Sequence, residues 1–154
     1  VKQYIPIWFR EGMASVTATQ EYRRARPKRI RNFLRKYKDS KVMHLPDHHL
    51  LRTKQWMIYS VSHWMFVYLL QKVKVRGIQQ LMAAMKRGAT FEKAFRQTTK
   101  QSTKQFERAF REQLERAPQT LHSSFLKGKQ QRKFSVRRDC ILSQIFCSSK
   151  AFYL

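Results

Sequence analysis

The sequence predicts an all-α protein of about five to six helices packed around a long apolar central helix at residues 48–73. Three observations support this fold class. Only four glycines and four prolines interrupt the 154 residues. The strict alternation of apolar and polar residues that marks half-buried strands is scarce. Hydrophobic residues make up 42% of the chain, which is enough to bury a core and argues against wholesale disorder.

The first helix is expected to run from near residue 7 to about residue 19. Its core face would carry Trp8, Met13 and Val16. Gly12 would let another backbone or a metal ion come close to this helix, because glycine has no Cβ. Gly12 therefore leaves room for a close approach to the first helix.

The second helix is expected to be basic and the third apolar. Pro27 suits the first turn of a basic helix that ends around Lys38, and a polar loop at residues 39–47 follows it. The third helix is apolar over residues 56–70, except at two serines and His63. A helix this apolar is buried in a core or in a membrane. Because its apolar stretch is shorter than the ~20 residues that a bilayer requires, no transmembrane segment is predicted.

Shorter helices are expected to close the domain. Gly77 is expected to end the long helix, and a stripe of apolar residues at helical spacing predicts a further helix up to Gly88. Thr90 is well placed to cap a short helix after that. Ser102 and Gln105 form a capping-box pattern that opens the last helix.

The pattern divides the chain into two parts. Residues 1–118 form the predicted helical domain, and residues 119–154 form a basic, irregular extension. The extension holds both cysteines, Cys140 and Cys147, and their spacing matches neither a zinc knuckle nor a redox motif. Buried free thiols are expected there, and the sequence predicts no compartment.

The segment Pro6-Ile7-Trp8-Phe9-Arg10-Glu11-Gly12-Met13-Ala14 places a carboxylate directly before a glycine inside an apolar stretch. A carboxylate in such surroundings needs a cation, a hydrogen-bond network or a metal. The segment resembles the one that carries the third zinc ligand in gluzincins, the thermolysin-like and aminopeptidase-like (peptidase MA-like) zinc metallopeptidases. Residues 59–70 are similar to the long helix that follows in that family, and residues 91–95 and 102–110 to its closing helices. The resemblance covers roughly residues 4–116.

The resemblance implies the helical carboxyl-terminal half of a gluzincin domain, with Glu11 as a zinc ligand and a peptide or protein as the substrate of the intact enzyme. It also implies that Tyr59 and His63 lie near the cleft, where a hydroxyl or an imidazole can stabilise an oxyanion. The sequence contains no His-Glu-x-x-His motif, which supplies two zinc ligands and the general base. His44 and His48 have the right spacing, but leucine stands where the base belongs and a proline interrupts the helix.

This chain alone is therefore expected to show no peptidase activity and to bind no zinc by itself. Two explanations of the missing motif stay open. The chain is the carboxyl-terminal part of a longer metallopeptidase, which the initial Val1 favours, or it is a complete chain that has lost its catalytic half. A pseudo-peptidase scaffold that kept the fold for protein binding is a further possibility. Simpler structural roles also stay open. Glu11 would then pair with an arginine, and Tyr59 and His63 would be packed core residues.

The charge of the chain indicates a different class of function. The 33 lysines and arginines outnumber nine acidic residues and give a formal net charge of +24. Ten of the basic residues fall within residues 23–41, where Asp39 is the only acid. Such a stretch suits a helix that lies on nucleic acid, on an anionic membrane or on an acidic protein, and it also suits a solvated surface helix. The residues expected to bind the anion are Arg23, Arg24, Arg29, Arg31, Arg35 and Lys36.

Overall fold

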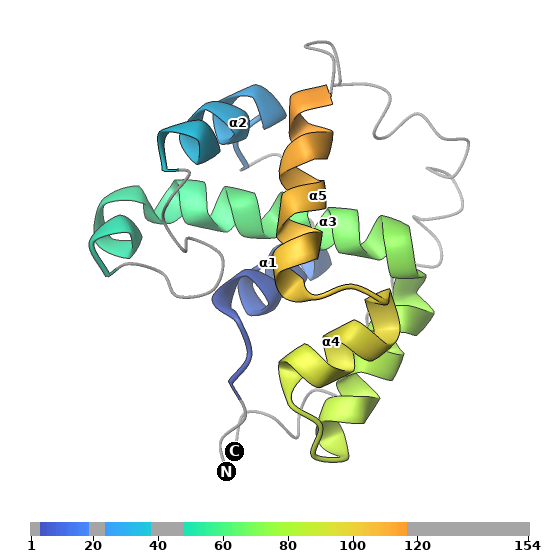
Figure 1. Ribbon diagram of the computed structural model, residues 1–154. Helices are drawn as coiled ribbons and strands as arrows, with labels where there is room; N and C mark the ends of the chain where they lie inside the picture. Colours follow the sequence, from blue (N-terminus) through green and yellow to red (C-terminus); the bar gives the residue numbers. More distant parts are fainter. Residues whose placement is uncertain (1–3, 19–23, 38–47, 117–154) are drawn as a thin grey trace. The chain divides into compact units, whose positions relative to one another are not determined.

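The computed structural model describes residues 4–18, 24–37 and 48–116. They form the five helices of Figure 1: α1 (Ile7–Thr17), α2 (Pro27–Lys36), α3 (His48–Lys86), α4 (Phe91–Thr99) and α5 (Thr103–Arg116). No strand occurs in these residues, so the predicted all-α class is confirmed for this part of the chain. The predicted loop at 39–47 and the predicted extension at 119–154, with both cysteines, lie outside the described residues.

Helix α1 packs on α3 through a close backbone contact at Gly12. A Cβ atom placed on Gly12 would lie 2.4 Å from the backbone oxygen of Ser62 and 2.6 Å from the Cβ of Phe66. Because neither of these atoms is the end of a flexible side chain, α1 can approach α3 this closely only with glycine at this position. The room that Gly12 leaves is therefore taken by α3, through the backbone of Ser62 and the Cβ of Phe66.

Trp8 joins α1 to the last two helices. Its side chain is 1% exposed, and its ring lies 6.1 Å from the ring of Phe95 on α4 and 5.8 Å from that of Phe106 on α5, measured between centroids. Edge and stacked contacts of this kind add to the burial energy of aromatic rings. Met13 and Val16, also expected in the core, are half-buried at its edge.

Helix α3 continues past the predicted range to Lys86, and its backbone breaks at Lys74 into two helical parts that both contribute buried residues to the core. Its buried residues begin at Ile58 and include Leu69, whereas Trp56 is 43% exposed and Lys72 is exposed. The backbone departs from helical geometry at Lys54 and at Lys74, where φ is 57°. The prediction of one apolar helix over residues 48–73 is therefore too broad, because Arg52, Lys54 and Lys72 within that range are exposed.

The predicted helix end at Gly77 lies three residues after the observed break in α3. Gly77 is buried inside α3, and a Cβ atom there would lie 2.5 Å from the Cβ of Val73. Here glycine relieves crowding within the helix, and the change of backbone direction occurs three residues earlier, at Lys74. Gly88, in contrast, lies after the helix with φ of 96°, which agrees with the predicted stop.

The caps of α4 and α5 agree with the sequence pattern. The hydroxyl of Thr90 accepts a hydrogen bond from the backbone N–H of Lys93 at 3.4 Å. At the start of α5, the N–H of Gln105 donates to the Ser102 hydroxyl at 3.2 Å, and the N–H of Ser102 donates to the Gln105 side chain at 2.8 Å. The predicted capping box is therefore confirmed.

Glu92 adds a contact between α4 and α5 that the sequence pattern does not indicate. Its carboxylate accepts hydrogen bonds from the backbone N–H and the hydroxyl of Thr103, at 3.3 and 2.7 Å. The first turn of α5 thus receives a negative charge, which is favourable at a helix amino terminus. None of the helices in the described residues has an apolar run long enough to span a bilayer.

Candidate functional site

The predicted zinc ligand, Glu11, lies on α1 with its side chain 34% exposed. Its ion-pair contact among the described residues is with its neighbour Arg10, at 4.0 Å between Oε1 and the guanidinium. A contact at that distance, made by an arginine side chain that is 53% exposed, contributes little to stability. The carboxylate is therefore half-buried and only weakly compensated by this arginine.

Ser15 lies one turn after Glu11, on the same face of α1. Its hydroxyl oxygen accepts a hydrogen bond from Nε of Arg24 at 2.8 Å and shares another with Nδ1 of His63 at 2.9 Å. Ser15 is 3% exposed and His63 is 0% exposed. A buried polar cluster of Ser15, Arg24 and His63 thus joins α1, the segment before α2, and α3.

His63 is held in the interior as a neutral ring. Burial and, to a lesser extent, the nearby positive charge of Arg24 together lower its pKa to about 4. Its Nε2 atom is buried and has no hydrogen-bond partner within the described part of the chain. His63, which was predicted to lie near the cleft, contacts Ser15 in the core, and their hydrogen bond joins α3 to α1.

The segment that carries Arg24 is fixed to α3 by both backbone groups of Ala25. The N–H of Ala25 donates to the hydroxyl of Ser60 at 3.0 Å, and its carbonyl accepts from the indole N–H of Trp64 at 3.0 Å. Ser60 in turn donates to the carbonyl of Trp56 at 2.8 Å. These bonds set the position of Arg24 next to Ser15.

Tyr59, the other predicted catalytic residue, is half-buried one turn before His63 on α3. Its hydroxyl oxygen accepts a hydrogen bond from the side-chain amide of Gln55 at 2.8 Å. The Arg24 guanidinium lies 5.8 Å from the centre of the Tyr59 ring, within the range of a cation–π contact. The structure therefore brings Tyr59 and His63 together around Arg24, with Ser15 of α1 completing the cluster.

The residues that the structure describes do not by themselves form a zinc site. Catalytic zinc takes three protein ligands, and no group of three His, Cys, Asp or Glu side chains occurs in the described residues. Glu11 supplies one carboxylate. The pair His44 and His48 lies outside the described side chains.

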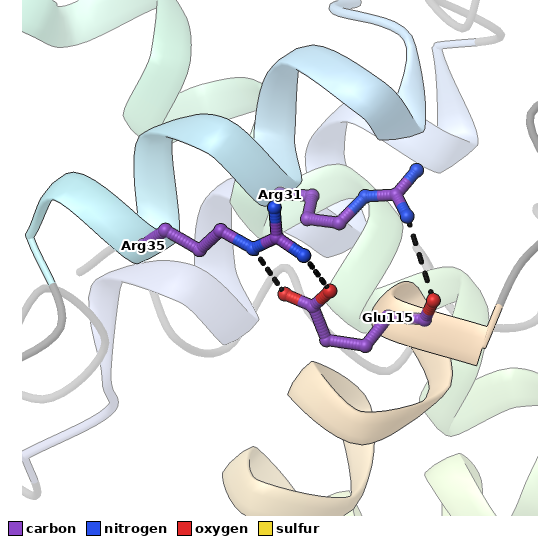
Figure 2. Close-up of polar contacts among 3 residues, drawn as sticks. All are labelled: Arg31, Arg35 and Glu115. Atoms are coloured by element: carbon purple, nitrogen blue, oxygen red, sulfur yellow. Dashed lines mark hydrogen bonds and ion pairs between the residues drawn. The ribbon is translucent and has the colours of Figure 1, made fainter.

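The six predicted anion-binding residues fall into four groups. Arg23 lies outside the described residues, and Arg24 is turned toward Ser15. Arg31 and Arg35 are tied to Glu115 of α5, as Figure 2 shows: Arg31 donates to the Glu115 backbone carbonyl at 3.4 Å, and Arg35 makes a two-pronged contact with its carboxylate. The hydrogen bonds from Arg35 lower the pKa of Glu115.

The remaining two predicted residues lie on the outside of α2. Arg29 is exposed, with its guanidinium 5.1 Å from the ring centre of Trp56, and Lys36 is exposed, with its ammonium 5.7 Å from that of Tyr37. Arg26 and Lys28 are exposed beside them and were not among the predicted binding residues. The outward cations of α2 therefore differ in part from the predicted set.

Comparison with known protein families, with curated proteins and with solved structures found no match for this chain. The gluzincin resemblance stays a prediction that depends on the residues themselves. Sequence reasoning missed Ser15 as a partner of His63. The available signal was the position of Ser15 one turn after Glu11, in a helix that is otherwise apolar on that side.

Proposed function

We propose that residues 4–116 are the carboxyl-terminal half of a gluzincin-type zinc metallopeptidase domain, in which Glu11 is one of the zinc ligands. The observation that carries the proposal is the close packing of α1 on α3 at Gly12. This contact fixes the residue before it, Glu11, at the edge of the α1–α3 interface. A metal ligand needs such a rigid support, because metal sites tolerate little error in distance.

The state of the Glu11 carboxylate supports the same role. A half-buried carboxylate loses part of its hydration and gains stability from a cation. Arg10 approaches only to 4.0 Å, so it provides little of that compensation. A divalent cation beside Glu11 would provide more, and the two histidines that complete such a site would come from outside the described residues.

Tyr59 is the residue of α3 best suited to act on a substrate. Its oxygen accepts the hydrogen bond from Gln55, which leaves its own hydrogen available for donation. The proposal gives Tyr59 the role of a donor to the oxyanion formed in peptide hydrolysis. His63 then acts as a positioning residue, because it is buried and holds Ser15 instead of reaching the surface.

A bound zinc ion in a complete domain would polarise the scissile carbonyl and activate water. The described residues provide one ligand, so the proposal assigns no peptidase activity to this chain alone. The chain would contribute one wall of the cleft, the Glu11 carboxylate and the Tyr59 hydroxyl to a peptide-hydrolysing enzyme.

Two experiments test the proposal. The first reads the coding sequence upstream of residue 1, where a His-Glu-x-x-His motif is expected some tens of residues before Glu11. An open reading frame that starts without this motif would reject the proposed enzyme. The second assays this chain alone for peptide hydrolysis with added zinc, and with chelator as the control. Chelator-sensitive turnover by the chain alone would contradict the assignment of the ligands.

A further inference from the structure

Helix α2 separates its apolar and cationic residues onto opposite faces. Its apolar residues Ile30, Phe33 and Leu34 are 0%, 8% and 3% exposed, so they are used in the core. The sequence from residue 24 to residue 37 contains no acidic residue. The exposed cations of α2 and of the residue before it are Arg26, Lys28, Arg29, Arg35 and Lys36.

Four of these five cations face solvent without an acidic partner. Arg35 is neutralised by Glu115. Arg26, Lys28, Arg29 and Lys36 make no ion pair with any residue in the described ranges. Cations gathered in this way on one short helix repel one another and attract a polyanion.

An exposed aromatic ring lies beside these cations. Trp56 at the start of α3 is 43% exposed, and the guanidinium of Arg29 lies 5.1 Å from its ring centre. The contact places the indole next to the cationic face of α2. A tryptophan ring beside cations matches the way in which single-stranded nucleic acids are held, with bases stacked on aromatic rings and phosphates paired with Lys and Arg.

We propose that Arg26, Lys28, Arg29, Lys36 and Trp56 form a binding surface for single-stranded nucleic acid, which we call the α2 surface. A membrane fits this surface less well. A helix that lies on a bilayer inserts an apolar face, and the apolar face of α2 is already buried in the protein. A duplex also fits less well, because its stacked bases offer no free ring face to Trp56.

The groove between α2 and α5 is a weaker candidate for an anion site. It encloses about 260 Å³ and is lined by Arg31, Arg35, Arg111 and Glu115, with two leucines as its floor. Its arginines already bind acceptors, since Arg111 contacts Glu107 at 2.9 Å and donates to the Leu34 carbonyl at 3.2 Å. The proposal therefore rests on the outward cations and on Trp56.

The test measures binding of a labelled oligothymidylate to the full chain by fluorescence anisotropy over a range of salt concentrations. The test variant neutralises three cations of the α2 surface: Lys28→Gln, Arg29→Gln and Lys36→Gln. Each phosphate contact on a single strand contributes about 0.7 to the slope of log affinity against log salt. The variant is therefore expected to lower the slope by about 2. Trp56→Ala is expected to weaken binding about tenfold with little change of slope.

A matched control removes the same charge elsewhere. Lys86→Gln, Arg87→Gln and Lys93→Gln neutralise three exposed cations at the end of α3 and on α4. The control is expected to bind like the wild type. An equal loss of binding affinity in both variants would show that only the net charge matters, and it would overturn the proposal.

Competition identifies the class of ligand. The single strand should compete better than duplex DNA and better than vesicles that contain phosphatidylserine. Stronger binding to duplex would overturn the single-strand assignment. Vesicle binding that the test variant abolishes, together with absent oligonucleotide binding, would show that the partner is a membrane. Circular dichroism of each variant separates these results from loss of fold.

Discussion

Lowering the pH should destabilise this protein through His63. The ring is fully buried, and burial together with Arg24 lowers its pKa from 6.5 to about 4. The unfolded chain therefore binds a proton at a higher pH than the folded chain does. Stability is complete above the unfolded pKa and falls as the pH decreases from 6.5 toward 4.

The magnitude follows from the difference between the two pKa values. A difference of 2.5, from 6.5 to about 4, corresponds at about 1.4 kcal/mol per unit to a total of about 3–4 kcal/mol of unfolding free energy, of which roughly 3 kcal/mol is lost by pH 4. Within the described residues, the ring bonds Ser15 of α1 and lies near the charge of Arg24, from the segment before α2. Neither is an acid that would favour a protonated ring, so the loss should not be offset locally.

The assay is urea denaturation, followed by circular dichroism, at several pH values between about 7 and about 4. His63→Asn serves as the comparison, because an asparagine amide can bond Ser15 and does not titrate. The variant will be less stable at neutral pH, since it leaves space in the core. The wild type should lose roughly 3 kcal/mol more than the variant between these limits. Parallel pH profiles for the two proteins would refute the reasoning.

Two further substitutions test the contacts that assemble the site. Gly12→Ala places a Cβ atom 2.4 Å from the Ser62 oxygen. We expect the free energy of unfolding to fall by about 1–3 kcal/mol because of overpacking. The gain in helix propensity, up to ~1 kcal/mol, is too small to offset this loss. An unchanged urea midpoint would contradict this contact. Ser60→Ala leaves the Ala25 N–H without its acceptor and should cost about 1–3 kcal/mol. Faster hydrogen exchange at Ala25 would report the local loss, and unchanged exchange would argue against the bond.

Local features of the fold were predictable from the sequence. The caps at Thr90 and at Ser102 depend on residues three positions apart, and such patterns can be read directly. Gly77 was misinterpreted because glycine serves both to end helices and to relieve crowding inside them, and the sequence pattern does not distinguish these uses. Trp56 was counted within an apolar run, although the structure leaves it exposed at the end of the buried part of α3.

The candidate site was predictable only in part, because its contacts join distant segments. Ser15 and His63 are 48 positions apart, so their hydrogen bond depends on how α1 crosses α3. The basic stretch was evident from composition. Which of its cations are paired was not evident. Arg35 is paired with Glu115, 80 positions away, whereas Lys28 faces solvent, and this difference depends on how α2 packs on α5. Sequence reasoning therefore identified the segments and not their partners.

The zinc content of the complete reading frame tests the central claim most directly. That claim is that Glu11 binds zinc together with two upstream histidines. Substitution of a residue that only hydrogen-bonds to a metal ligand typically lowers metal affinity roughly 10–100-fold. Because Glu11 is proposed to be a ligand itself, Glu11→Gln should lower zinc affinity by more than that. Glu112→Gln, which changes an exposed glutamate on α5, should keep the wild-type zinc content. Equal zinc content in wild type and Glu11→Gln would contradict the account.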